Sequence, residues 1–135
     1  MSILGILAAI VLPEFQNHQK MAKETQAKAN LKLLREAIER YAIDHGVPPG
    51  YQDNDPAQPL MAVTVYRQLV VENSYLTAIP KNPFNGYDGM KVYIALQDFP
   101  TEADGLSGWM YKPSTKEIRL NWTGNDSEGI AYFSY

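Results

Sequence analysis

The sequence has no cysteine among its 135 residues. This absence excludes disulfide bonds, cysteine-ligated zinc, iron–sulfur clusters and thiol nucleophiles. Histidine is scarce as well, so histidine-based catalysis would depend on His18 or His45. The formal net charge is −3 at pH 7. Because proteins that bind nucleic acid through its phosphates usually carry a basic excess, the composition gives no direct evidence for nucleic acid as a partner.

The familiar catalytic motifs are missing too. The sequence contains no glycine-rich phosphate loop, no His-Glu-x-x-His and no Gly-x-Ser-x-Gly. Its acidic residues fall in turns or on a predicted helix, where Glu24 precedes Lys28 by four residues and Glu36 precedes Arg40 by four. This spacing predicts weak ion pairs on a solvated helix face rather than an acid–base pair. We therefore predict that the protein is not an enzyme.

The first twelve residues carry no charge, although charged residues make up 20% of the chain. This apolar run is shorter than the roughly 20 residues that a membrane-spanning helix needs. No basic region precedes it, as a signal peptide would require. Three interpretations stay open at this point: an apolar segment that reaches halfway into a membrane, a buried core helix, or a longer span whose beginning is missing.

A long helix is predicted to follow, from Glu14 to His45, where strong helix formers dominate and proline and glycine are absent. Gly46 and the prolines after it end the helix. Proline kinks a helix without necessarily ending it, so one kinked helix from Ile3 to His45 is possible, roughly 65 Å long. The remaining residues make a domain only about 25–30 Å across. The N-terminal half of the helix must therefore find a membrane or other subunits. The predicted apolar stripe consists of Met21, Ala27, Leu31, Leu34, Ala37, Ile38, Tyr41 and Ala42.

The second half of the chain has shorter periodic segments. A polar connector at 51–59 precedes a predicted short helix at 63–73, for which a strand is the alternative. Strand-like runs follow at 92–96, 109–112, 117–121 and 130–135, and the middle two flank a four-residue turn typical of a hairpin. Strands joined by short links pair antiparallel. The predicted fold class is α+β: a kinked helix at 1–45 packed on a head at 46–135 with a small antiparallel sheet.

Three segments resemble one known family. Ile3–Pro13 reads Gly-Ile-Leu-Ala-Ala-Ile-Val-Leu-Pro from its third residue, and it closely resembles the N-terminal helix of type IV pilins and type II secretion pseudopilins. The segment from Tyr75 to Gly86 resembles the turn-rich segment of the major pseudopilin of type II secretion, with Asn82 where Asp is usual. Gly108-Trp109-Met110-Tyr111 is similar to its sheet. The family's Thr-Leu-Ile-Glu run is absent, so the sequence is expected to be truncated relative to the family.

The resemblance implies a pilin-like fold and a structural role. The chain would be a subunit of a helical pilus or pseudopilus filament, of a type II secretion kind. Its partners would be further copies, other pilin-like subunits and an assembly machine. It would lie in the bacterial inner membrane before assembly, and afterwards in a periplasmic or cell-surface filament. The residues expected to pack between subunits are Ile3, Leu4, Gly5, Ile6, Leu7, Ala8, Ala9, Ile10, Val11, Leu12, Pro13 and Phe15.

A calcium ion is also implied. The major pseudopilins resemble this chain in lacking a disulfide, and they use Ca²⁺ in a late loop instead. The corresponding candidate here is the loop at 123–129, where Asn125, Asp126 and Glu128 offer the oxygen ligands that Ca²⁺ prefers. The alternative for this loop is a solvated turn between two strands.

Two other functions remain open. The chain could be a type IV pilin used for adhesion, motility or DNA uptake, although the missing disulfide and the segment at 80–86 favour the pseudopilin. It could also be a membrane-anchored binding module with an aromatic ligand face on the sheet. Core packing and subunit contact are the preferred interpretation of most of these aromatic residues, which are Tyr93, Trp109, Tyr111, Trp122, Tyr132, Phe133 and Tyr135.

Overall fold

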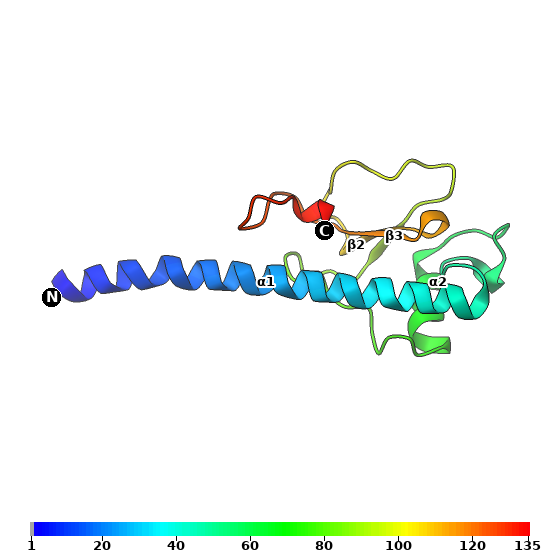
Figure 1. Ribbon diagram of the computed structural model, residues 1–135, viewed down its shortest axis with the longest axis horizontal. Coiled ribbons are helices and arrows are strands. Elements are labelled where there is room, and N and C mark those ends of the chain that lie inside the picture. Colours follow the sequence, from blue (N-terminus) through cyan, green and yellow to red (C-terminus); the bar gives the residue numbers. More distant parts are fainter. Residues whose placement is uncertain (1) are drawn as a thin grey trace.

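A computed structural model describes the backbone of residues 2–135 and the side chains of residues 17–135. One long helix lies along the molecule, and the head packs against its C-terminal half (Figure 1). The regular elements are helix α1 (Ser2–His45), helix α2 (Ala62–Tyr66) with the π-helical turn Arg67–Glu72 that continues it, and strands β1 (Met90–Val92), β2 (Trp109–Lys112) and β3 (Glu117–Leu120).

Helix α1 continues through Pro13 without a break, which confirms the predicted single helix. A bend at Pro13 stays a prediction. The helix ends as expected, because Gly46 adopts a positive φ of 77° and its N–H donates to the carbonyl of Ala42 at 2.9 Å. Met21, by contrast, is 52% exposed rather than part of the buried stripe, since burial among the described side chains of α1, from residue 17 on, begins at Glu24. Among the described residues, no helix has both the length and the apolar character needed to cross a membrane.

The sheet has the order β1-β2-β3 and is mixed. The predicted hairpin is confirmed, because β2 and β3 pair antiparallel with Trp109 opposite Leu120 and Tyr111 opposite Ile118. The fully antiparallel sheet was wrong, since β1 pairs parallel to β2 with Met90 opposite Trp109. The chain between them is long enough to return to the starting edge, which a parallel pair requires.

Two predicted strands also need correction. The run at 92–96 contributes only Val92 to a strand, and β1 instead begins two residues earlier at Met90. The run at 130–135 forms the short 3₁₀ turn Tyr132–Ser134 rather than a strand. Its β-branched and aromatic composition fits a sheet, but the side chain of Tyr132 is buried beside α1 instead, and Ala131 makes only an isolated bridge with Asn125. The second helix predicted at 63–73 is confirmed within one residue at each end.

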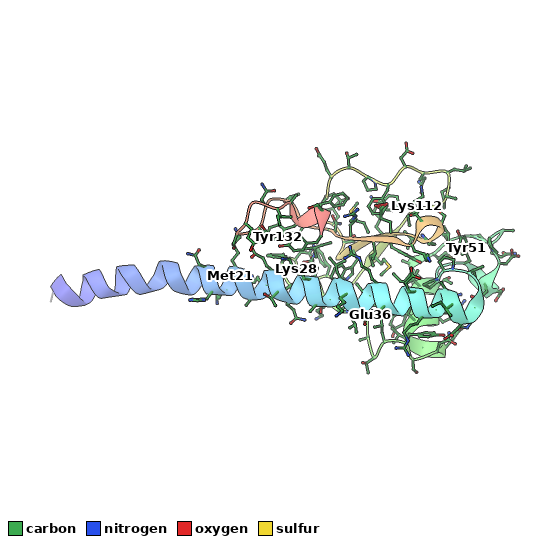
Figure 2. The ribbon with its side chains drawn as sticks, in the orientation of Figure 1. Met21, Lys28, Glu36, Tyr51, Lys112 and Tyr132 are labelled. Atoms are coloured by element: carbon green, nitrogen blue, oxygen red, sulfur yellow. The ribbon has the colours of Figure 1, made fainter. Side chains whose placement is uncertain are left out.

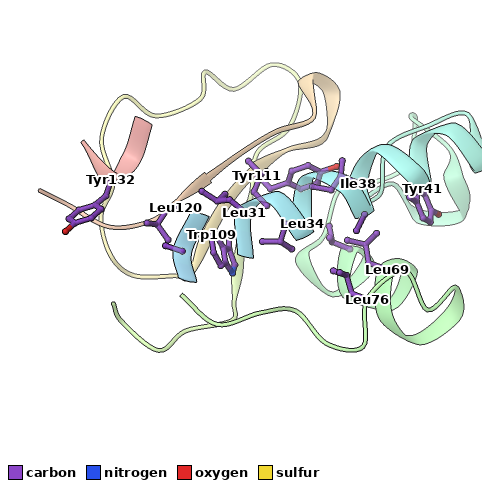
Figure 3. Packing of buried hydrophobic residues seen from close by; sticks show 14 residues of the cluster. Leu31, Leu34, Ile38, Tyr41, Leu69, Leu76, Trp109, Tyr111, Leu120 and Tyr132 are labelled. Atoms are coloured by element: carbon purple, nitrogen blue, oxygen red, sulfur yellow. The ribbon is translucent and has the colours of Figure 1, made fainter. Parts of the chain in front are cut away.

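The core lies between α1, the sheet and α2 (Figure 3). Leu34 and Ile38 project from α1 toward Trp109 and Tyr111 of β2, and Leu69 closes the cluster from the side of α2. Two buried aromatic residues also satisfy their polar atoms: Trp109 Nε1–H donates to Pro80 O at 2.8 Å, and Tyr111 O–H donates to Pro49 O at 2.9 Å. The head is thus held on the helix by apolar packing.

Candidate subunit interface and C-terminal loop

The N-terminal part of α1 projects beyond the head (Figure 1). Its backbone is helical from Ser2 onward, but the side chains predicted to pack between subunits, Ile3–Pro13 and Phe15, lie outside the residues whose side chains are described. Their packing role therefore stays a prediction. What the structure adds is that the head of the same chain packs further along the helix.

The described part of α1 also carries apolar side chains on its exposed side. Met21, Leu33 and Ile43 are exposed, while Leu31, Leu34 and Ile38 on the opposite side are buried. Two more exposed leucines, Leu96 and Leu106, lie in the long loop between β1 and β2. Exposed apolar residues of this kind suit contacts with other protein subunits.

The loop at 123–129 is folded tightly around Asp126. The backbone N–H of Asp126 donates to Ile130 O at 2.7 Å. The Asp126 Oδ1 accepts hydrogen bonds from the N–H groups of Glu128 and Ile130 at 2.8 and 2.9 Å. Its Oδ2 accepts one from the Tyr135 hydroxyl at 2.8 Å. Burial alone would raise the pKa of Asp126, but the hydrogen bonds outweigh it and lower that pKa. The ionised carboxylate is thus the group that closes this loop.

A second carboxylate fastens the same loop to α1. Glu24 is only 7% exposed, and its oxygens accept hydrogen bonds from Ser127 N–H at 3.1 Å and from the Tyr132 hydroxyl at 2.9 Å. The Ser127 hydroxyl lies within 3.2 Å of both oxygens. Burial, followed by the hydrogen bond to Glu24, raises the pKa of Tyr132 to about 12. Figure 2 shows Tyr132 on the C-terminal segment beside α1.

From the sequence, we placed Glu24 on the solvated face of the helix, and we did not predict that it binds the C-terminal loop. The predicted ion pairs of Glu24 with Lys28 and of Glu36 with Arg40 are not among those formed by residues 17–135. Glu24 precedes Ala27 by three residues and Leu31 by seven, so its position belongs to the buried stripe. This spacing was the signal in the sequence that Glu24 is buried. A buried carboxylate needs hydrogen-bond donors, so the spacing also pointed to partners for it.

The three candidate calcium ligands lie in one turn, but differ in their surroundings. Asn125 and Glu128 are exposed, while Asp126 is buried and already accepts three hydrogen bonds. A carboxylate has about four lone-pair sites, so roughly one remains for a cation. Within the described part of the chain, no three acidic or histidine side chains are grouped as a metal site would require. The residues therefore fit at most a loose, largely hydrated ion, and calcium binding stays a prediction.

Two buried asparagines hold the loops beside the sheet. Asn82, which stands where the resembling family usually has Asp, donates from Nδ2 to Gly108 O at 3.1 Å and accepts at Oδ1 from Phe84 N–H at 2.9 Å. Asn121 accepts from the N–H groups of Asp104 and Gly105 at 2.9 and 3.0 Å. An ionised Asp could not donate at position 82, so this departure from the family pattern suits the local structure.

The aromatic residues of the second half do not form an open face. Trp109, Tyr111 and Tyr132 are buried in the core. The other four of the seven singled out from the sequence, Tyr93, Trp122, Phe133 and Tyr135, are half-buried. Phe133 stacks on Phe99 and Trp122 on Phe84, while the rings of Tyr93 and Phe99 meet at a tilt. This arrangement agrees with core packing as their main role and gives less support to a broad aromatic ligand face.

Comparisons with known proteins give relatives of two kinds. The type IV major pilin protein PilE of Neisseria gonorrhoeae is 29% identical over 94% of this chain and 80% of its own length. The type II secretion system core protein G of Vibrio cholerae is 27% identical over 78% of this chain and 75% of its own length. The core protein G of Pseudomonas aeruginosa is 40% identical, over 37% of this chain and 35% of its own.

No family model matches the chain, and no solved structure matches it. The named relatives are pilins and secretion-system core proteins, which are structural subunits rather than enzymes. Their alignments cover both the long helix and the head, and the α+β fold with one long N-terminal helix agrees with them. The chain is therefore similar to type IV major pilins and to the core protein G of type II secretion systems.

Proposed function

We propose that this protein is a structural subunit of a helical filament, a pilus or a pseudopilus, that assembles through the N-terminal part of α1. The observation that carries the proposal is the apolar segment of α1 projecting beyond the head of its own chain. An uncharged helix end of this kind is unfavourable in water and calls for a partner. Gly5, Ala8 and Ala9 are small, which lets neighbouring helices approach closely.

Such contacts would be heterologous, with one face of a subunit meeting a different face of the next. Heterologous contacts that do not close into a ring generate an open helical filament. The exposed residues Leu33, Ile43 and Leu106 supply apolar area on the helix and the head for such contacts. The other expected partners, additional pilin-like subunits and an assembly machine, are part of the same proposal.

Electron microscopy of the full-length chain with a charge introduced into the apolar segment tests this proposal. The substitution Leu7→Arg should abolish filaments, because a charge buried between apolar helices is strongly unfavourable. Ser114→Arg, which adds the same side chain on the exposed turn between β2 and β3, is the matched control and should leave filaments intact. Filaments of normal abundance from the Leu7 variant would overturn the proposal. Circular dichroism establishes that both variants fold.

The finer proposal is that the filament is a pseudopilus of type II secretion rather than a surface pilus. Core protein G appears among the relatives twice, and the turn-rich segment from Tyr75 to Gly86 resembles the major pseudopilin. A surface pilus remains the second candidate, because a major pilin is aligned over 94% of this chain and 80% of its own length. Complementation separates them: the chain should restore secretion to bacteria that lack core protein G, and should not restore pili to bacteria that lack their major pilin.

The proposed location follows from the same segment. Before assembly, the apolar residues would lie in the inner membrane, and after assembly in the centre of a periplasmic or cell-surface filament. Cell fractionation tests both stages: the full-length chain should sediment with membranes when the assembly machine is absent. Recovery of the monomer entirely from the aqueous fraction would contradict a membrane stage.

Calcium remains part of the proposal as a weak ligand of the loop at 123–129. The support is the remaining acceptor capacity of Asp126 and the exposed oxygens of Asn125 and Glu128 beside it. Binding sites with few protein oxygens fall in the range of about 10⁻⁴–10⁻³ M. Isothermal titration should give a dissociation constant in this range, and Glu128→Gln should weaken it. The absence of binding heat at millimolar Ca²⁺ would remove calcium from the proposal.

A further inference from the structure

A groove of about 370 Å³ lies where the head meets the exposed start of the described part of α1. Lys20 and Lys23 line it from the helix, and Phe84, Trp122 and Asn125 line it from the head. The rings of Phe84 and Trp122 stack with their centroids 5.7 Å apart and an angle of 11° between planes. A hollow with paired aromatic rings and lysines on its rim can accept a ligand that is part apolar and part anionic.

The charge around the groove differs from that of the whole chain. The chain is acidic, with a net charge of −3, yet the helix carries four lysines between residues 17 and 32, at positions 20, 23, 28 and 32. The one acidic side chain of that stretch, Glu24, is buried against Ser127 and Tyr132. Among residues 17–135, no acidic group lies within ion-pair distance of Lys20 or Lys23. The start of the described helix is therefore a locally basic surface.

The position of this surface along α1 points to one occupant. Lys20 follows Phe15, the last residue of the segment proposed to pack between subunits, by about 7.5 Å along the helix axis. The headgroup layer of a membrane is about 5–8 Å thick on each side of the hydrocarbon. Helical side chains lean toward the N-terminus, so both lysines reach back toward that layer. Tryptophan beside lysine is the combination found where proteins meet the headgroups of lipids.

We propose that Lys20, Lys23 and Trp122 form a docking surface for the anionic headgroups of membrane lipids, which holds the head against the membrane before assembly. The lysines supply the charge that complements the lipid phosphate. The stacked pair of Trp122 and Phe84 supplies an amphipathic surface at the same level. The proposal rests on the proposed function in one respect, namely that the apolar segment lies in a membrane before the filament forms.

Vesicle partitioning of the full-length chain tests the proposal. Two vesicle compositions are used, phosphatidylcholine alone and phosphatidylcholine with phosphatidylglycerol, and the double variant Lys20→Gln/Lys23→Gln is compared with the parent. Each lysine near an anionic surface contributes roughly a factor of five, so the variant should partition about 30-fold less into the anionic vesicles. Its partition into phosphatidylcholine alone should not change. Lys32→Gln/Lys81→Gln removes the same charge further along α1 and on the head, and should have a much smaller effect.

Tryptophan fluorescence gives a second readout. Trp109 is fully buried, while Trp122 is half-buried beside the groove. Anionic lipids that carry a bromine quencher near the headgroup should therefore quench Trp122 alone, and Trp122→Phe should remove the quenching. Quenching that persists in this variant would overturn the placement of the groove.

Other results would also overturn the proposal. An equal loss of binding from both vesicle types, or an equal loss with the control pair, would mean that the lysines do not recognise lipid charge. Displacement by millimolar inorganic phosphate would indicate a site for free anions instead. Weaker filaments with unchanged vesicle binding would assign the lysines to contacts with another copy of the chain. If the parent fails to bind phosphatidylcholine vesicles at all, the membrane stage of the proposed function fails, which is distinct from losing only the anionic preference.

Discussion

Residues 2–23 and residues 24–45 belong to one continuous helix, yet the N-terminal part projects beyond the head, and burial among the described side chains of the helix begins at Glu24. Both stretches are rich in good helix formers, so local propensity explains the helix in each. The second stretch is stabilised further by the burial of Leu31, Leu34 and Ile38 in the core. The comparison teaches that local propensity forms the helix in both stretches, whereas the head packs on the second, and the proposed function gives the first a partner outside the chain.

The largest expected effect comes from the packed half. Leu34→Ala removes a fully buried side chain and should lower the free energy of unfolding by about 2–5 kcal/mol, because the lost burial leaves a cavity. Its neighbour Leu33 is 47% exposed, and Leu33→Ala should change that free energy by no more than about 0.5 kcal/mol. Urea denaturation followed by circular dichroism measures both. Equal losses for the two leucines would contradict the packing described for α1.

A substitution at Leu7 tests the difference between the two halves of α1. Leu7→Ala should leave the urea midpoint of the head unchanged, because the helix there projects beyond the head (Figure 1). The same variant should weaken filament formation, since the apolar segment is the proposed assembly surface. A marked fall in the stability of the head would mean that the N-terminal segment folds back onto its own chain.

A middle-sized effect is expected where the two halves meet, at Glu24. Glu24→Ala removes the acceptor for Ser127 and Tyr132 and should cost about 1–3 kcal/mol of stability. Glu36→Ala removes an exposed carboxylate from the same helix and is the control. Hydrogen exchange of the loop at 123–131 should accelerate in the Glu24 variant only. Unchanged exchange would show that the loop closes without this carboxylate.

A smaller effect appears only in alkaline solution. The pKa of Tyr132 is raised to about 12 in the folded state, while an exposed tyrosine titrates near 10. The neutral hydroxyl therefore stabilises the fold fully below pH 10, and this contribution is lost as the pH rises toward 12. Thermal unfolding against pH should show the decline, and Tyr132→Phe should reduce it. Tyr87→Phe, at an exposed position, should leave the decline as it is.

The smallest effect concerns calcium. At a Ca²⁺ concentration equal to the dissociation constant, binding stabilises a protein by only about 0.4 kcal/mol. Calorimetric unfolding should thus show a slight upward shift with millimolar Ca²⁺, which EDTA reverses. Asp126→Asn should abolish the shift. The same variant loses the ionised carboxylate whose pKa is lowered in the fold, so it should also lose the stabilisation that disappears when acid protonates Asp126.

Local patterns predicted the helices and the hairpin well. Both predicted helices agree with the structure to within about a residue at the ends that can be compared, and the pair at 109–112 and 117–120 has the expected antiparallel register. The pairing of β1 could not be predicted in the same way. Its partner lies beyond a long loop, so its direction depends on packing between distant segments rather than on the spacing of neighbouring residues.

The C-terminal loop shows a second kind of limit. Its acidic and amide residues were recognised from the sequence as a group, but the donors that satisfy them were not. Ser127 and Tyr132 meet Glu24 across more than 100 residues, and Tyr135 reaches back to Asp126. Composition indicates that oxygen-rich side chains gather here, whereas the folded chain decides whether they face a cation or one another.

The sequence by itself determined the long helix, its uncharged beginning and its end at Gly46, because helix propensity and capping depend on neighbouring residues. It also determined the resemblance to pilins, which those same residues carry. Only the tertiary structure decided that Glu24 turns inward, that β1 runs parallel to β2, and that Lys20 and Lys23 share a groove with Trp122. The physical reason is that each of these features depends on residues far apart in the chain, which are brought together by burial of the common apolar core.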